Sequence, residues 1–115
     1  MVKIERVRHA SDEPFAVETC YLPDTDFPGL LGKHLETNSL FSLIEHEFGV
    51  TLSYADEEVD ATAADERVAH LLGVSRDSPI LRIRQIIRST NTRAIIYVVG
   101  LYRSQRHTLF IRRFR

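Results

Sequence analysis

The sequence ILRIRQIIRSTNTRAIIYVVGLY occupies residues 80–102 and has the pattern of two long strands. From Ile80 to Ser89, apolar residues alternate with polar ones, as in a strand that buries one face. The polar run 90–93 has the composition of a turn, and residues 94–102 are apolar on both faces of a strand. The stretch therefore predicts a β-hairpin whose second strand is covered on both sides.

The cover for this second strand has more than one candidate source. Residues 39–48 and 63–72 have the apolar spacing of amphipathic helices, and each segment is followed by a glycine that can end it. Thr62, with Asp65 three residues later, resembles a capping box at the start of the second helix. Helices supply cover on one side of the sheet, whereas a ligand cavity or a dimer partner would supply it on the other.

Residues 2–10 and 14–22 predict a second hairpin at the N-terminus, joined by the turn-like residues 11–13. With a three-residue loop, residues whose numbers sum to 24 lie opposite each other. Arg6 then faces Glu18 across the two strands.

Three charged residues of this hairpin share one strand face with aliphatic side chains: Arg6, Arg8 and Glu18. Charges that point into a covered sheet face must be paired or must meet a ligand. The alternative is an exposed face with ordinary surface ion pairs. The helix start at Ser39 is a second candidate anion contact, because free N–H groups and the helix dipole favour a carboxylate or phosphate there. A plain serine cap is the alternative at that position.

The predicted elements follow the order β-β-α-β-α-β-β-β. A further strand is expected over residues 50–62, and residues 108–114 can add one more edge strand. We find no repeat, low-complexity tract or linker, so residues 1–115 are expected to form a single domain. The order indicates an α+β fold, with an antiparallel sheet and helices packed against it.

The composition excludes several classes of function. Fifteen Lys and Arg against sixteen Asp and Glu leave a net charge of -1, which gives no attraction to nucleic acid or to anionic lipid. No run approaches the roughly 18 apolar residues of a membrane helix, and the charged N-terminus does not resemble a signal peptide. We therefore expect a cytoplasmic chain with no membrane contact. The single Cys20 cannot form an intramolecular disulfide and is expected to be buried.

Signatures of catalysis and of metal binding are missing from the sequence. It has no Gly-rich phosphate loop, no GxSxG, and no HExxH or CxxC spacing. The five histidines are scattered, whereas a tight metal site usually takes two ligands from one short element. We expect no catalytic residue, no metal and no cofactor. The arginines at 82, 84 and 88 alternate on one strand face that we expect to be solvated.

Several fragments, in this order and spacing, resemble one known family, the UTRA domain of HutC-subfamily GntR-type transcription regulators. The fragments are Arg6-Val7-Arg8, residues 13–18, Asn38-Ser39-Leu40-Phe41, residues 69–74, residues 78–81 and residues 101–106. From first to last, the match spans nearly all of the 115 residues.

The resemblance implies a chorismate-lyase-like fold that binds a small effector and follows an N-terminal winged helix-turn-helix domain. That DNA-binding domain is expected to be absent from this chain, so DNA contact is expected only through it. A homodimer is expected because winged-helix operators are commonly bound by two-fold pairs. Family members that bind phosphorylated sugars use the corresponding arginines, glutamate and helix start. The predicted effector-binding residues are Arg6, Arg8, Glu18, Ser39, Leu40, Phe41 and Tyr102.

Three positions depart from the family pattern: Phe41 replaces a Tyr, Ile96 replaces a Glu and Gln105 replaces an Asp. The lost polar groups favour an effector that has an anionic group and a more apolar body than a sugar phosphate. Two functions remain: a sensor that binds such an effector, or an enzyme of the chorismate lyase type that eliminates pyruvate from a carboxylated ring. The sequence favours the sensor, because no acid or base in it has a distinctive setting.

Overall fold

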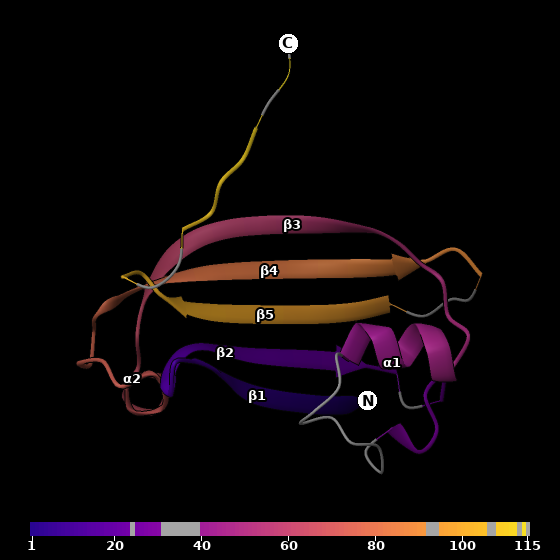
Figure 1. Ribbon diagram of the computed structural model, residues 1–115, viewed down its shortest axis with the longest axis horizontal. Coiled ribbons are helices and arrows are strands. Elements are labelled where there is room, and N and C mark those ends of the chain that lie inside the picture. The colour runs from indigo at the N-terminus through magenta and orange to yellow at the C-terminus, as the bar shows by residue number, and fades with distance from the viewer. Residues whose placement is uncertain (24, 31–39, 92–94, 106–107, 113, 115) are drawn as a thin grey trace.

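The computed structural model describes residues 1–23, 25–30, 40–91, 95–105, 108–112 and 114. Within these residues, five strands form one antiparallel sheet in the order β1-β2-β5-β4-β3 (Figure 1). The strands are β1 Val2–Ala10, β2 Glu13–Leu22, β3 Leu52–Ala63, β4 Pro79–Ser89 and β5 Ile95–Arg103. The helices are α1 Leu40–Glu47 and α2 Glu66–Leu72. The predicted α+β fold is confirmed.

The β1–β2 hairpin has the predicted register but a different turn. Ser11 and Asp12 form a two-residue turn with φ of 51° and 64°, which is the left-handed conformation that tight hairpins require. A β-bulge then shifts the register after Arg8, so that Arg6 lies opposite Glu18. The predicted three-residue loop is wrong. The register is nevertheless the predicted one, because the shorter turn and the bulge together produce the same pairing.

The apolar strand β5 lies in the middle of the sheet, between β2 and β4. It pairs with β4 as the predicted hairpin, and it pairs with β2 from the other end of the chain. Where a sheet is covered on both sides, a central strand buries both of its faces. This explains why β5 is apolar on both faces.

Helix α1 covers one end of the sheet on one side, which we call the α1 face. Leu43 and Ile44 of the helix belong to the same core cluster as Ile4, Cys20 and Val98. These three strand residues are paired across β1, β2 and β5, so they point to the same side. Burial of Leu43 and Ile44 against these strand residues holds α1 on the sheet.

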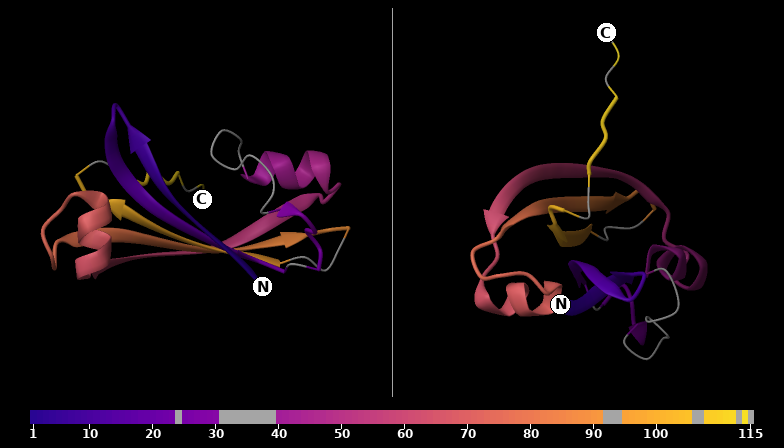
Figure 2. Two further views of the ribbon diagram at one scale, coloured as in Figure 1. Left: turned by 90° about the horizontal axis from the view of Figure 1, so that it is seen from below. Right: turned by 60° about the vertical axis from the view of Figure 1, so that its left-hand side comes forward.

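Helix α2 covers the opposite end of the sheet on the other side, the α2 face (Figures 1 and 2). Val68 and Leu72 pack with Val17 of β2 and Ile80 of β4. Val17 is three residues from Cys20 and therefore points to the opposite side of the strand. The two helices cover both faces of β5, but each covers only one end.

The start of α2 corrects the predicted cap. Asp65 is the N-cap, and its carboxylate accepts a hydrogen bond of 2.8 Å from the backbone N–H of Val68. Thr62 and Ala63 belong instead to β3, where pairing with β4 holds them extended. The predicted capping box at Thr62 is therefore wrong. The predicted stop at Gly73 is confirmed by its φ of 67°.

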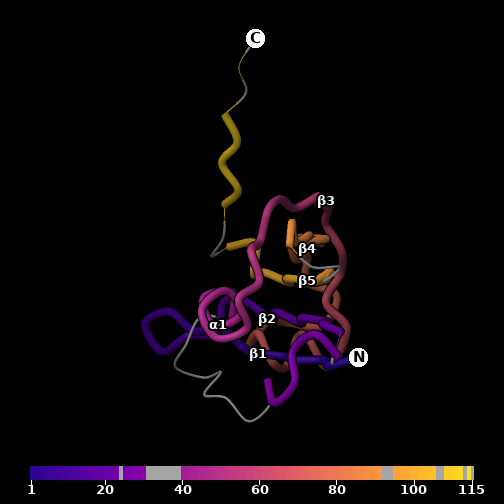
Figure 3. Tube along the Cα trace, turned by 90° about the vertical axis from the view of Figure 1, so that its right-hand side faces the viewer, coloured from indigo at the N-terminus to yellow at the C-terminus, as the bar shows by residue number. Residues whose placement is uncertain are grey.

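The predicted edge strand over residues 108–114 does not form. Its described residues, 108–112 and 114, have no strand pairing and are exposed. In Figure 3 this C-terminal stretch extends away from the sheet. A strand needs a partner edge, and this segment has none among the described strands. None of the described helices is long and apolar enough to cross a membrane.

Candidate functional site

Two neighbouring rows of side chains on the α1 face bring together the predicted residues of the strands. Antiparallel pairing places opposite residues on the same side of the sheet, with neighbouring strands about 4.8 Å apart. In order across β1, β2 and β5, the rows are Arg6–Glu18–Gly100 and Arg8–Ala16–Tyr102. We call this surface the arginine patch. It lies beside the row of Cys20, which α1 covers.

Glu18 is the carboxylate between the two arginines. Its Oε1 lies 3.6 Å from Nη1 of Arg8, and the two side chains are 23% and 45% exposed. Arg6 forms no ion pair with any residue that the structure describes. Two guanidinium groups therefore face one carboxylate, and the patch has an excess of positive charge that an anion can neutralise.

The ring of Tyr102 lies over Gly100. A Cβ atom at position 100 would lie 2.6 Å from Cε2 of Tyr102 and 2.8 Å from its Oη. Only a residue without a side chain leaves room for the ring in this position. Sequence analysis missed Gly100, although a glycine inside a strand pattern was an available signal.

The phenol of Tyr102 is a neutral hydrogen-bond donor in this setting. Burial raises its pKa above the ordinary value, and the negative charge of Glu18 raises it further. The hydroxyl consequently keeps its proton at neutral pH, beside the arginines.

Cys20 lies beside the patch, in the next row along β2, and is buried. It is 3% exposed, and burial raises the pKa of its thiol to about 11, although the charge of Arg6 opposes this shift. A thiol that stays protonated is a poor nucleophile. The expectation of a buried, apolar cysteine is confirmed.

The start of α1 is described in part, because Ser39 lies outside the described residues. The Leu40 side chain is 2% exposed and belongs to the core, so only its backbone can reach a ligand. Phe41 is half-buried and packs against the same core cluster. Ile96, which departs from the family pattern, is fully buried in that cluster and lies away from the surface.

The α2 face carries charges that are paired with one another. Arg82 donates hydrogen bonds of 2.9 and 2.6 Å to the carboxylate of Asp60, and this contact lowers the pKa of Asp60. Arg84 lies 3.3 Å from Glu58 on the same two strands. Carboxylates on the neighbouring strand neutralise Arg82 and Arg84. These arginines are therefore less available to a ligand than those of the arginine patch. Across the described residues, no three potential metal ligands come together.

Comparisons with known proteins relate this chain to transcription regulators. Residues 1–108 match the model of the UTRA domain. The HTH-type transcriptional repressor NagR of Bacillus subtilis is 31% identical over 106 residues, which are 92% of this chain and 43% of the repressor.

Two solved structures share the fold. The ligand-binding domain of a protein assigned to the GntR family in Bordetella bronchiseptica is 32% identical, with a TM-score of 0.80 and coverage of 94% of this chain and 73% of that one. The effector domain of PhnF from Mycobacterium smegmatis is 27% identical, with a TM-score of 0.85 and coverage of 92% and 65%.

The chain spans less than half the length of the curated relatives that it matches. These relatives are named as repressors or regulators and not as enzymes, which argues against the chorismate-lyase alternative. The family model covers nearly the whole chain, and the sheet and helices agree with the solved effector domain. The chain belongs to the UTRA domain family of GntR-type transcription regulators.

Proposed function

We propose that this domain binds a small anionic effector at the arginine patch. The observation that carries the proposal is the charge balance of the patch: Glu18 pairs with Arg8, whereas Arg6, opposite Glu18 in the strand register, has no ion-pair partner among the described residues. A phosphate or carboxylate that contacts both arginines gains charge-assisted hydrogen bonds, each of which contributes roughly 1.5 to 3 kcal/mol.

The neighbouring groups have distinct roles in this proposal. Glu18 orients the arginines or accepts a hydrogen bond from an effector hydroxyl. Tyr102 donates from its hydroxyl, and its ring offers apolar contact to the effector body. The backbone N–H groups at Ser39, Leu40 and Phe41 form a second contact for the anionic group, because free N–H groups at a helix start favour negative charge.

We further propose that the domain acts as a homodimer in the cytoplasm, within a regulator that contacts DNA through a winged helix-turn-helix part. The relatives named as HTH-type regulators support this arrangement. The net charge of -1 favours a DNA contact made elsewhere than on this domain.

A thermal-shift screen with Arg8→Ala tests the effector site. The probes are inorganic phosphate, sulfate, phosphorylated sugars and small carboxylates. A ligand at a hundred times its Kd stabilises the native state by about 2.7 kcal/mol, which raises the melting temperature by roughly 10 °C in a domain of this size. Arg8→Ala is expected to weaken binding about tenfold to a hundredfold while it changes the melting temperature of the free domain by only a few degrees.

Arg88→Ala is the matched control, because Arg88 lies on the α2 face opposite Ile95 and outside the arginine patch. We expect this variant to keep the full response to the anion. If Arg8→Ala keeps the full response, or if both variants lose it equally, the arginine patch is not the effector site.

A further inference from the structure

Gly100 is a buried glycine in the central strand β5, although its backbone does not need one. The described glycines with positive φ are Gly29, Gly49 and Gly73, so a residue with a side chain can adopt the conformation at position 100. A glycine weakens the interior of a strand because it has no side chain to pack. What it provides here is room for the ring of Tyr102, which a Cβ atom at position 100 would meet at 2.6 Å.

The ring of Tyr102 leaves its own row and lies across the neighbouring row of the arginine patch. Its far end, Cε2, Oη and Cζ, would lie 2.6, 2.8 and 2.9 Å from that Cβ. Gly100 is opposite Glu18 on β2 and Ile83 on β4. One side of the ring therefore faces the backbone of β5, and the other faces away from the sheet. Tyr102 is only half-buried, so part of this aromatic surface stays open.

The open ring lies beside the arginines at a distance that suits a small cyclic molecule. Tyr102 is in the row of Arg8, and Ala16 is the residue between them. Neighbouring strands are about 4.8 Å apart, so the backbones of Arg8 and Tyr102 are separated by about 10 Å. The methyl group of Ala16 leaves the space above it free. A ligand whose charged group meets Arg8 can therefore place its body against the ring.

We propose that Gly100 and Tyr102 make the arginine patch selective for anions whose charged group is attached to a flat, aromatic ring. This inference rests on the proposed effector site and names the chemical class of its ligand. Tyr102 is the surface on which the ligand ring packs, and Gly100 is the positioning residue that keeps the phenol ring in place. Aromatic rings prefer offset-stacked or edge-to-face contacts, which corresponds to about three- to tenfold tighter binding than burial alone gives.

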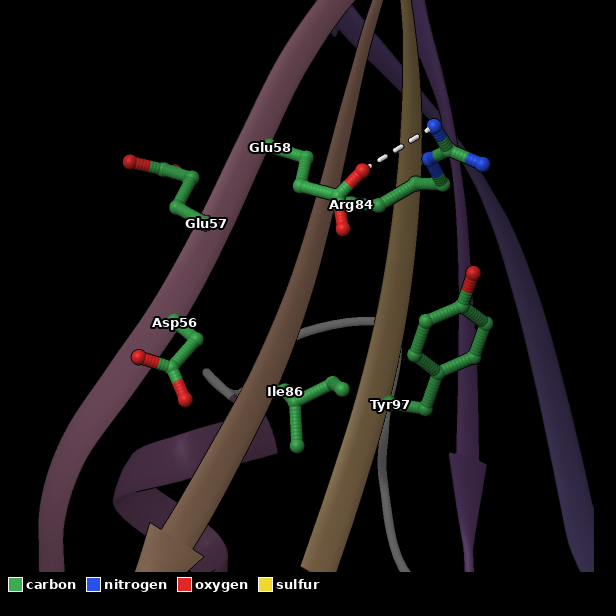
Figure 4. Close-up of a pocket in the computed structure, with 6 residues that line it drawn as sticks. All are labelled: Asp56, Glu57, Glu58, Arg84, Ile86 and Tyr97. Atoms are coloured by element: carbon green, nitrogen blue, oxygen red, sulfur yellow. Dashed lines mark hydrogen bonds and ion pairs between the residues drawn. The ribbon is translucent and has the colours of Figure 1, made fainter.

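The α2 face also brings an aromatic ring near an arginine, but its charge is unsuitable. A depression of about 250 Å³ is lined there by Tyr97, Ile86 and Arg84 together with the acidic residues 56–58 (Figure 4). Arg84 lies 3.3 Å from the carboxylate of Glu58. The acidic side of this depression repels a carboxylate ligand. Tyr97 therefore supplies a matched control, because it is an aromatic residue of the same strand on the opposite face.

Isothermal titration calorimetry with benzoate and cyclohexanecarboxylate tests the selectivity. Both probes carry one negative charge at neutral pH, and both have a six-membered ring. The saturated ring is the more apolar one, so burial alone favours cyclohexanecarboxylate. We expect benzoate to bind about three- to tenfold more tightly to the unmodified domain. Equal affinities, or tighter binding of cyclohexanecarboxylate, would overturn the inference.

Variants of the two tyrosines identify the ring that is responsible. Tyr102→Leu is expected to bring the ratio of the two affinities to about one, whereas Tyr102→Phe keeps the ratio because the ring remains. Tyr97→Leu should also keep it. All three variants should bind cyclohexanecarboxylate within about twofold of the unmodified domain, which shows that the fold and the arginine contacts are intact. A benzoate preference that survives Tyr102→Leu, or that is lost equally in Tyr97→Leu, contradicts the inference.

Gly100→Ala tests the positioning role with Arg6, Arg8 and Tyr102 all present. The clash is with the far end of a flexible side chain, so the ring moves while the strand keeps its pairing. We expect the benzoate preference to fall to about one, with little change for cyclohexanecarboxylate. Equal weakening of both probes would show that Gly100 has only a structural role. If neither probe binds the unmodified domain, or if Arg8→Ala leaves the binding of both unchanged, the proposed effector site is wrong and this inference is wrong with it.

Discussion

Replacement of Gly100 by alanine is expected to have opposite effects on stability in two backgrounds. The new Cβ would lie 2.6 Å from Cε2 of Tyr102, so the ring must move. Overpacking of this kind costs roughly 1 to 3 kcal/mol. Alanine in a strand also gains about 0.5 to 1 kcal/mol over glycine, because the unfolded chain loses less freedom. In the unmodified domain, we therefore expect a net change between about zero and 2.5 kcal/mol of destabilisation.

The same substitution in a Tyr102→Ala background removes the clash and leaves only the backbone gain. There, Gly100→Ala should stabilise the fold by about 0.5 to 1 kcal/mol. Urea unfolding of the four proteins gives the coupling energy, which should be roughly 1 to 3 kcal/mol. If Gly100→Ala changes the free energy of unfolding equally in both backgrounds, the ring does not lie over Gly100 in solution.

The phenol titration of Tyr102 gives a second measurement of the same geometry. Burial raises the pKa of this group, so a ring pushed into solvent should titrate closer to its ordinary range. The chain has four tyrosines, so the tyrosinate absorbance of Tyr102 is taken as the difference between each protein and its matched Tyr102→Phe variant. An unchanged titration in Gly100→Ala would show that the ring had not moved.

Three further outcomes follow from individual contacts. Asp65→Ala should destabilise the domain by about 1 kcal/mol in urea unfolding, because the N–H of Val68 loses its cap. The raised pKa of Cys20 gives the fold a stability that is complete below the unfolded pKa near 9. Cys20 should therefore lower the free energy of unfolding by up to about 1.4 kcal/mol per pH unit between pH 9 and 11, and Cys20→Ala should remove this part of the slope. In an NMR titration, the Asp60 carboxyl should titrate below its usual range, and Arg82→Gln should return it upward.

Local patterns in the sequence were sufficient to predict most of the sheet. Alternation places Arg6, Arg8 and Glu18 on one face, and the apolar β5 is indeed central. The bulge after Arg8 was not predictable, because the same register results from a longer loop without one. Long-range pairing also determines where α2 starts. Thr62 and Asp65 are both good capping residues, but the pairing of β3 with β4 extends the strand past Thr62. The cap is therefore Asp65.

The candidate site was predictable only in part. Strand alternation identifies the arginines, but the position of Tyr102 depends on the pairing of β2 with β5, which are far apart in the sequence. Tyr102 entered the prediction through the family resemblance. The role of Gly100 depends on a side chain folding back along its own strand, which periodicity does not reveal. Residues 108–112 have the pattern of a strand, but they pair with none of the described strands.

The most direct test of the effector site is an NMR titration of the ¹⁵N-labelled domain with inorganic phosphate and then with small carboxylates. Binding at the arginine patch predicts that the Nε–H signals of Arg6 and Arg8 shift together and saturate at one affinity, while the signal of Arg88 on the α2 face stays in place. Shifts confined to Arg88 and its neighbours, or no saturable shift at Arg6 and Arg8 with any anion of the series, would contradict the proposed site.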